Sequence, residues 1–358
     1  MNKKLVLEDG SEFHGKAFGY KEDVYGEVVF ATSMSGYQEL LTDPSLLGQM
    51  LVMTYPLVGN YGINREDYES LRPFLSALIV REHCTHPSNF RSEKTLEAYM
   101  EKYRLPGLSG IDTRQLTRHI REKGALKGAI LPAEMPLSEC LEKIDRHPFF
   151  TNHIERASTK NAYDVPGGGK RVVLMDFGMK AGILKGLLEE GYHVSVVPHD
   201  TSAEEILEQN PDGVLLSNGP GNPEDALVPI ETVKGLLGQV PLFGICMGHQ
   251  LLALAAGAKT RKMKFGHRGG NNAVRDHRSG KVLITSQNHG YEVDSASLEG
   301  TGLSVLYSCV NDGSIEGLVL PGRKAFSVQF HPESSPGPRD ARVLYQEFKR
   351  LMENGEVE

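Results

Sequence analysis

Pro241-Leu-Phe-Gly-Ile-Cys246-Met-Gly-His-Gln250 is an apolar run that ends at a cysteine between two glycines and continues into a Leu/Ala-rich run. This order predicts a strand, a tight turn and a helix. Gly244 and Gly248 fit the turn, because a Cβ on either side would crowd the backbone. Most free cysteines only fill space in a core. At this turn, however, the sulfur projects from the backbone and the helix N-terminus favours a thiolate, so Cys246 is predicted to be a nucleophile.

A second segment, Lys324-Ala-Phe-Ser-Val-Gln-Phe-His331-Pro-Glu333, is an apolar strand that ends in a histidine and a carboxylate. His331 could take the thiol proton of Cys246. Glu333 could orient the imidazole and stabilise its protonated form. His-Pro-Glu alone is a weak signal, but together with the cysteine turn it indicates nucleophilic catalysis.

Gly213-Val-Leu-Leu-Ser-Asn-Gly219-Pro-Gly221 also runs from an apolar strand into a glycine-rich turn. Alone it would be an ordinary loop. In a doubly wound sheet, neighbouring strands deliver their loops to one carboxyl edge, so this turn is expected beside the cysteine. The N–H groups of Gly221 and Met247 could then stabilise an oxyanion. This arrangement is typical of acyl transfer through a thioester.

The second half of the chain alternates strand-like and helix-like segments, which predicts an α/β fold with a doubly wound, mainly parallel sheet. Later β-rich segments should add antiparallel strands before the strand that delivers His331. The predicted strands are 171–176, 194–197, 213–216, 241–245, 282–285, 303–307 and 315–320, and the predicted helices are 183–189, one opened by a capping box at Ser202–Glu205, 230–237, 251–256 and 341–352.

The first half predicts a mixed β/α domain over residues 1–157. A hairpin is expected around Asp9-Gly10, with later strands at 27–30, 50–54 and 75–80. Two helices follow, one beginning near Ser92 and one from the cap Asp112 to Gly124. Residues 158–170 contain a proline followed by three glycines, which predicts a linker before the domain at 171–358.

At these residues the chain from Lys170 onward resembles the class I glutamine amidotransferases, which share the pattern Gly-x-Cys-x-Gly-x-Gln and a Cys-His-Glu triad ending in His-Pro-Glu. Further motifs resemble the small, glutaminase subunits of carbamoyl phosphate synthetases, and the resemblance then covers nearly the whole chain. These motifs are Ser35-Gly-Tyr-Gln-Glu, Leu41-Thr-Asp-Pro-Ser45, Gly110-Ile-Asp-Thr, Lys262-Met-Lys-Phe-Gly-His and Ser286-Gln-Asn-His-Gly.

The resemblance implies a glutaminase whose ammonia passes to a large synthetase subunit. That subunit would use ATP, Mg and bicarbonate to make carbamoyl phosphate for pyrimidine and arginine synthesis, while this chain would need no cofactor or metal of its own. The N-terminal domain would dock the large subunit in a heterodimer. Glutamine would be held by Ser45, Gly219, Gly221, Met247, Gln250, Asn288, Gly290 and Tyr291. Ser45 could equally be a turn residue after Asp43-Pro44.

The sequence alone also allows other functions. The chain could serve another synthetase, could be a non-catalytic regulatory subunit, or could be a cysteine peptidase of the same fold. His249 and His289 could each be proposed as the base, although packing or loop hydrogen bonding is the more common role.

Composition narrows the class of protein. The net charge of −7, without a basic tract, argues against nucleic-acid binding. The N-terminus lacks the apolar region of a signal peptide and no apolar run is long enough to span a bilayer, so a cytoplasmic location is expected. Four widely spaced cysteines suggest neither disulfides nor zinc.

Overall fold

The computed structural model describes residues 1–355 and divides into two compact units. The first is Met1–Phe150, and the second begins at Thr151. The segment 158–170, expected as a linker, lies within the second unit. There Tyr163–Val165 forms strand β10, which pairs with β12 (His193–Pro198). None of the helices in the described part of the chain combines the length and apolar character needed to cross a bilayer.

The N-terminal unit is built around a closed barrel of seven strands in the order β1-β2-β8-β6-β4-β3-β9. The predicted hairpin is confirmed: β1 and β2 pair antiparallel, and Gly10 at their turn has a φ of 86°. The barrel strands are β1 Asn2–Leu7, β2 Glu12–Gly19, β3 Val24–Ala31, β4 Gln49–Met53, β6 Ala77–Ile79, β8 Pro106–Ser109 and β9 Leu126–Pro132; a separate pair is β5 Leu57–Val58 with β7 Glu82–His83.

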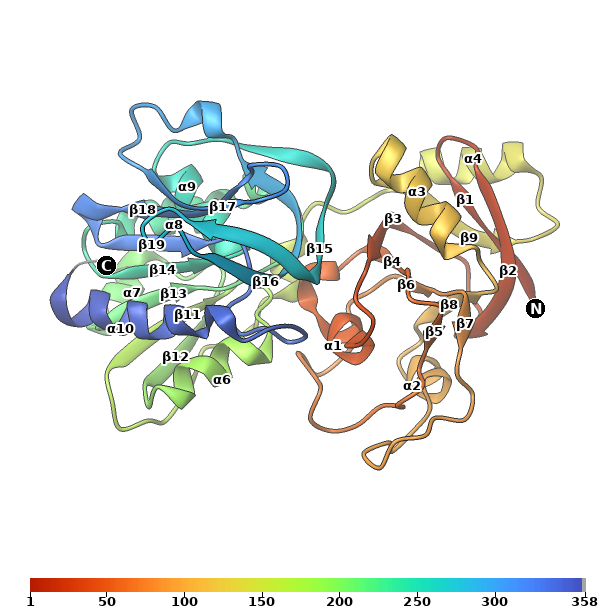
Figure 1. The fold of residues 1–358 in the computed structure, drawn as a ribbon, viewed down its shortest axis with the longest axis horizontal. Coiled ribbons are helices and arrows are strands. Elements are labelled where there is room, and N and C mark those ends of the chain that lie inside the picture. The colour runs from red at the N-terminus through yellow and green to blue at the C-terminus, as the bar shows by residue number, and fades with distance from the viewer. Residues whose placement is uncertain (356–358) are drawn as a thin grey trace. The chain divides into compact units, whose positions relative to one another are not determined.

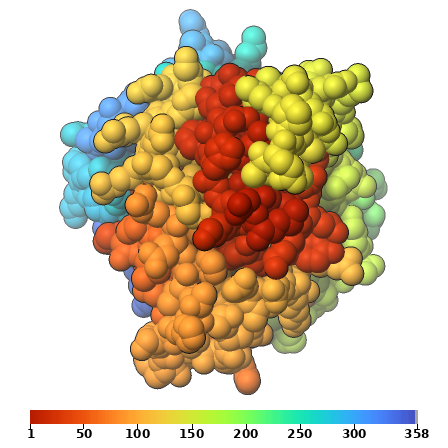
Figure 2. All heavy atoms as spheres, turned by 90° about the vertical axis from the view of Figure 1, so that its right-hand side faces the viewer, coloured from red at the N-terminus to blue at the C-terminus, as the bar shows by residue number. Residues whose placement is uncertain are grey.

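Short helices surround this barrel. Helix α3 has both predicted ends, because the Asp112 side chain accepts from the Gln115 N–H and Gly124 is the C-cap. The other predicted helix begins later than expected, since Thr95 and not Ser92 provides the cap. In the space-filling view, the yellow α4 segment lies against the red β1–β2 surface (Figure 2). The helices of this unit are α1 Tyr37–Thr42, α2 Leu96–Lys102, α3 Thr113–Lys123 and α4 Leu137–Arg146.

The second unit contains a ten-stranded sheet in the order β10-β12-β11-β13-β14-β19-β18-β17-β15-β16 (Figure 1). Strands β12, β11, β13, β14 and β19 are parallel, and β18 to β16 continue antiparallel. The predicted fold class is therefore confirmed. The remaining strands are β11 Arg171–Asp176, β13 Gly213–Leu216, β14 Leu242–Ile245, β15 Thr260–Asp276, β16 Val282–Val293, β17 Ser304–Cys309, β18 Ile315–Leu320 and β19 Ala325–Val328.

Helices cover both faces of the parallel part of this sheet, and each face has its own apolar core. One core includes buried side chains from α7, α8 and α9, and the other includes side chains from α6 and α10. The predicted capping box at the start of α7 is present, with both Ser202–Glu205 hydrogen bonds formed. The helices of this unit are α5 His153–Ala157, α6 Ala181–Glu189, α7 Ala203–Glu208, α8 Leu227–Leu236, α9 Met247–Ala255 and α10 Val343–Asn354.

Phe243 provides a test of the core that supports the cysteine turn. Its side chain is fully buried and stacks on Phe326, with ring centroids 4.4 Å apart. We expect Phe243→Ala to lower the free energy of unfolding by about 3–5 kcal/mol, because a cavity replaces the ring. Leu227→Ala, at a side chain that is 70% exposed, should change it by less than about 0.5 kcal/mol. The chain has no tryptophan, so urea unfolding should be followed by far-UV circular dichroism. An equal loss of unfolding free energy in both variants would show that the Phe243 ring does not support the core.

Candidate active site

Cys246 lies between β14 and α9 in a strained backbone conformation, with a φ of 54° and a ψ of −101°. Such a positive φ is rare for a residue with a side chain. The two flanking glycines permit the turn. A Cβ on Gly248 would lie 2.2 Å from the Leu216 carbonyl oxygen, and one on Gly244 would lie 2.6 Å from the carbonyl oxygen of Gly248. The turn can therefore form only with glycine at both positions.

His331 and Glu333 follow β19, the parallel neighbour of β14, so both reach the sheet edge that carries Cys246. His331 Nδ1 lies 2.6 Å from Glu333 Oε1. The other ring nitrogen, Nε2, is buried and has no hydrogen-bond partner among the described residues. The Cys246 thiol is nevertheless close enough to raise the pKa of His331. Long contacts of this kind are common at catalytic sites without substrate.

Lys180 is a third charged group of this cluster, and no sequence motif predicted it. Its Nζ donates to Glu333 Oε1 at 2.9 Å, and both side chains are almost completely buried. Lys180 is the N-cap residue of α6, and its main-chain N–H donates to the side-chain oxygen of Asn218. In the sequence, Lys180 is marked only by its position shortly after the β11 strand. Many lysines follow strands in this way, so the position does not indicate a function.

The charges of this cluster shift both titrating groups. Burial alone would raise the pKa of Glu333, but Lys180 and His331 hold it far below the usual carboxyl range. Burial alone would lower the pKa of His331, but the Glu333 carboxylate raises it to about 10 against the opposing charge of Lys180. The cationic form of the His331 ring is therefore stabilised beside Cys246, with its Nδ1 held by an ionised carboxylate.

The two predicted oxyanion donors lie in separate turns of the same unit. Met247 is the first residue of α9, where N–H groups have no partner within the helix. The next N–H, of Gly248, donates to the Ser217 carbonyl. Gly221 has a φ of 91°, and a Cβ there would lie 2.8 Å from His153 Cβ. Gly219 approaches the Phe177 carbonyl oxygen so closely that a Cβ would lie 2.4 Å from it.

Two of the predicted glutamine-binding residues, Asn288 and Gln250, hydrogen-bond to Cys246. The thiol lies 3.8 Å from the Asn288 carbonyl oxygen, to which it donates. Gln250, on α9, donates from Nε2 to the Tyr291 carbonyl at 2.8 Å and to Gln329 Oε1 at 2.9 Å. Gly290 lies between Asn288 and Tyr291 on β16. Ser45 lies in the N-terminal unit, in a 3₁₀ turn where its N–H donates to the Asp43 carboxylate.

The other two candidate bases are held in different surroundings. His249 is completely buried on α9, where its Nδ1 lies 2.9 Å from the Ser327 hydroxyl, and burial lowers its pKa to about 3. His289 is buried on β16, and burial followed by the charge of His267 lowers its pKa well below the usual value. Neither ring has a carboxylate partner like Glu333 at hydrogen-bond distance among the hydrogen bonds described.

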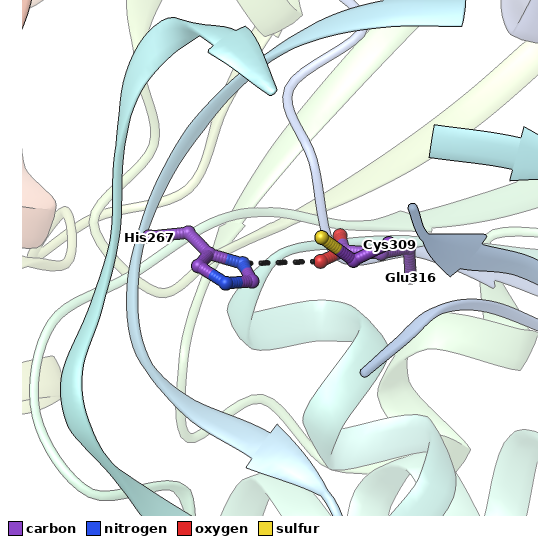
Figure 3. A group of neighbouring side chains, drawn as sticks. All are labelled: His267, Cys309 and Glu316. Atoms are coloured by element: carbon purple, nitrogen blue, oxygen red, sulfur yellow. Dashed lines mark hydrogen bonds and ion pairs between the residues drawn. The ribbon is translucent and has the colours of Figure 1, made fainter. Parts of the chain in front are cut away.

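His267, Cys309 and Glu316 form a second polar group, outside the set predicted from the sequence (Figure 3). Each offers one atom that could bind a metal, all within 4.8 Å of one another. However, His267 Nδ1 and Glu316 Oε1 already face each other at 3.2 Å. An ion pair accounts for their geometry without a metal.

Family models match both units. Residues 173–351 match the family described as "Glutamine amidotransferase class-I", and residues 5–130 match "Carbamoyl-phosphate synthase small chain, CPSase domain". The fold of the second unit is thus that of a class I glutamine amidotransferase domain. The chain belongs to the carbamoyl-phosphate synthase small chain family.

Curated relatives match over almost the full length. The chain is 55% identical to the "Carbamoyl phosphate synthase pyrimidine-specific small chain" of Halalkalibacterium halodurans, over 99% of this chain and 98% of that protein. It is 53% identical to the protein of the same description from Bacillus subtilis, over 100% of this chain and 98% of that protein. Among solved structures, a putative GMP synthase subunit from Thermoplasma acidophilum has a TM-score of 0.45 and 22% identity, over 52% of this chain and 95% of that chain.

The raised pKa of His331 predicts a pH dependence of stability. A histidine whose pKa rises from 6.5 to about 10 on folding stabilises the folded state fully below pH 6.5, and this contribution is lost as the pH rises through about 10. We expect the free energy of unfolding of the wild-type chain to fall more steeply over this range than that of His331→Asn. Urea unfolding at a series of pH values measures both slopes, and identical slopes would contradict the charged pair.

Proposed function

We propose that Cys246, His331 and Glu333 hydrolyse glutamine and that the ammonia released serves carbamoyl phosphate synthesis. The observation that carries the proposal is the strained Cys246 turn beside a histidine whose other nitrogen lies 2.6 Å from a buried carboxylate. Membership of the carbamoyl-phosphate synthase small chain family supports the same activity.

In the proposed reaction, the proton of the Cys246 thiol passes to His331, and the Glu333 carboxylate that raises the pKa of the ring stabilises the resulting thiolate–imidazolium pair. The sulfur attacks the side-chain amide carbon of glutamine and forms a tetrahedral oxyanion. His331 then gives the proton to the leaving nitrogen, and ammonia departs from a γ-glutamyl thioester on Cys246. Water hydrolyses the thioester to glutamate, with His331 again accepting the proton. Lys180 keeps Glu333 ionised throughout.

The oxyanion is proposed to lie between the N–H groups of Gly221 and Met247. Met247 also gains the partial positive charge of the α9 N-terminus. Glutamine is proposed to be held by Gly219, Gln250, Asn288, Gly290 and Tyr291 of the second unit. The role of Ser45 stays a prediction from the family resemblance.

The proposed partner is the large subunit of a carbamoyl phosphate synthetase, in a cytoplasmic heterodimer. That subunit would use ATP and Mg, as the family resemblance implies, and this chain has no Gly-x-x-x-x-Gly-Lys-Ser/Thr loop. Two of the matched relatives are described as pyrimidine-specific, which supports a role in pyrimidine synthesis. Supply of arginine synthesis remains the second possible pathway.

We expect Cys246→Ala and His331→Asn each to abolish ammonia release from glutamine, because one lacks the nucleophile and the other the base. His249→Asn is the matched control and should keep a measurable rate, since His249 bonds only Ser327 Oγ among the hydrogen bonds described. His289→Asn should also keep a measurable rate. Ammonia release should be assayed with and without a large subunit supplied with ATP and bicarbonate. Comparable loss in all four variants would remove the proposed roles.

The N-terminal unit is proposed to dock the large subunit. Deletion of Met1–Phe150 should abolish co-purification of the two subunits, whereas Cys246→Ala should leave it intact. Far-UV circular dichroism of the shortened chain establishes that its α/β sheet is still folded. Retained co-purification by a folded, shortened chain would place the docking surface in the amidotransferase unit instead.

A further inference from the structure

Strand β16 contacts both partners of the proposed proton transfer through its main chain. The Asn288 carbonyl accepts from the Cys246 thiol at 3.8 Å, and the Ser286 carbonyl accepts from the His331 N–H at 2.9 Å. A shift of this strand would therefore move its contacts with Cys246 and with His331 together. Contacts that hold β16 in position therefore also hold its main-chain contacts with Cys246 and His331.

The backbone ladder alone holds β16 poorly. It is the last strand in the sheet order, where its ladder partner is β15, and a single isolated bridge described for it joins Ser286 to His331. Its register with β15 shifts between Lys262 and His267, and again between Gly269 and Asn272. These irregularities lie on either side of the segment 287–289. The ladder is locally disrupted at both irregularities, so side-chain contacts contribute to holding the segment between them.

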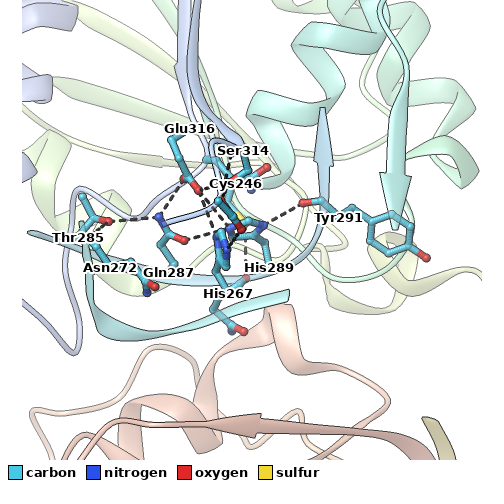
Figure 4. Close-up of polar contacts among 12 residues, drawn as sticks. Cys246, His267, Asn272, Thr285, Gln287, His289, Tyr291, Ser314 and Glu316 are labelled. Atoms are coloured by element: carbon cyan, nitrogen blue, oxygen red, sulfur yellow. Dashed lines mark hydrogen bonds and ion pairs between the residues drawn. The ribbon is translucent and has the colours of Figure 1, made fainter. Parts of the chain in front are cut away.

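Glu316, on β18, supplies this support through its contact with Gln287 of β16 (Figure 4). Its side chain is fully buried and its Oε2 accepts from Gln287 Nε2 at 2.9 Å. Gln287 Oε1 in turn lies 3.2 Å from His289 Nε2. The Glu316 main-chain carbonyl accepts from the Gln329 N–H, two residues before His331. One residue thus joins β16 to the segment that carries the base.

A buried carboxylate needs its own compensation, and His267 provides it. His267 Nδ1 lies 3.2 Å from Glu316 Oε1, and the Ser314 hydroxyl lies 3.3 Å from the same oxygen. Burial lowers the pKa of His267, but Glu316 and Asp312 raise it to about 9, so the ring is cationic at neutral pH. Burial raises the pKa of Glu316, and the His267 bond and charge oppose this shift. Donors face both of its carboxylate oxygens, as a buried carboxyl group requires.

We propose that Glu316 is a positioning residue that fixes β16, and through it the contacts of Cys246 and His331, by bonding Gln287 and His267. The inference rests on the proposed function for its catalytic consequence, but its structural part stands on the bonds to β16 alone. Glu316 itself contacts neither Cys246 nor His331 through its side chain in the hydrogen bonds described.

Glu316→Ala should be compared with Glu347→Ala. Glu347 is also buried and pairs with Arg278, at the turn of the same β15–β16 hairpin and away from residues 286–291. Hydrogen exchange read by mass spectrometry should show faster exchange of residues 286–291 in Glu316→Ala only. We expect kcat/KM for glutamine to fall in that variant by about 10- to 100-fold, and to stay near wild type in Glu347→Ala. Wild-type exchange of this segment in Glu316→Ala would overturn the proposal.

Two further variants keep the test decisive if Glu316→Ala does not fold. Gln287→Ala removes the link but leaves the His267 ion pair, and should reproduce the local increase in exchange. Glu316→Gln keeps a side-chain acceptor and should restore part of the protection. A folded Gln287→Ala chain with unchanged exchange would refute the link. Because exchange needs no glutamine, a wild-type chain without glutaminase activity would reject the proposed function while the exchange results still decide the role of Glu316.

Discussion

The buried carboxylate of Glu333 is the constraint on which the amidotransferase site depends. An ionised group with almost no solvent contact is tolerated only where opposite charges and hydrogen bonds surround it. Lys180 and His331 supply those charges from the ends of two different segments, one after β11 and one after β19. Both contacts reach Oε1, while Oε2 has no partner among the hydrogen bonds described. The contacts at Oε1 hold the base beside Cys246 and keep its ring in one orientation.

The strained turn at Cys246 is the second requirement. A residue with a positive φ costs free energy, which the surrounding structure must offset. Here the offset comes from the core under the turn, where Phe243 stacks on Phe326, and from the close approach of Gly248 to Leu216. The turn positions the sulfur of Cys246. The other triad residues and the main chain of β16 determine its reactivity.

The fold could be predicted well where the chain has a local signal. Alternating strands and helices, the capping box at Ser202 and the cap at Asp112 all occur as expected. The closed barrel of the first unit was not predicted, because pairing such as that of β3 with β9 joins strands far apart in the chain. The long β15 was missed as well, since its polar residues and glycines give no regular alternation.

By itself, the sequence determined the α/β class, the cysteine turn and the His-Pro-Glu segment, because each depends on local backbone requirements and on residue types at fixed spacing. The tertiary structure alone decided that Lys180 pairs with Glu333 and that His267 pairs with Glu316. Lys180 precedes Glu333 by 153 residues, and His267 precedes Glu316 by 49. Local propensity carries no information about such pairs, since only the stacking order of the strands brings them together.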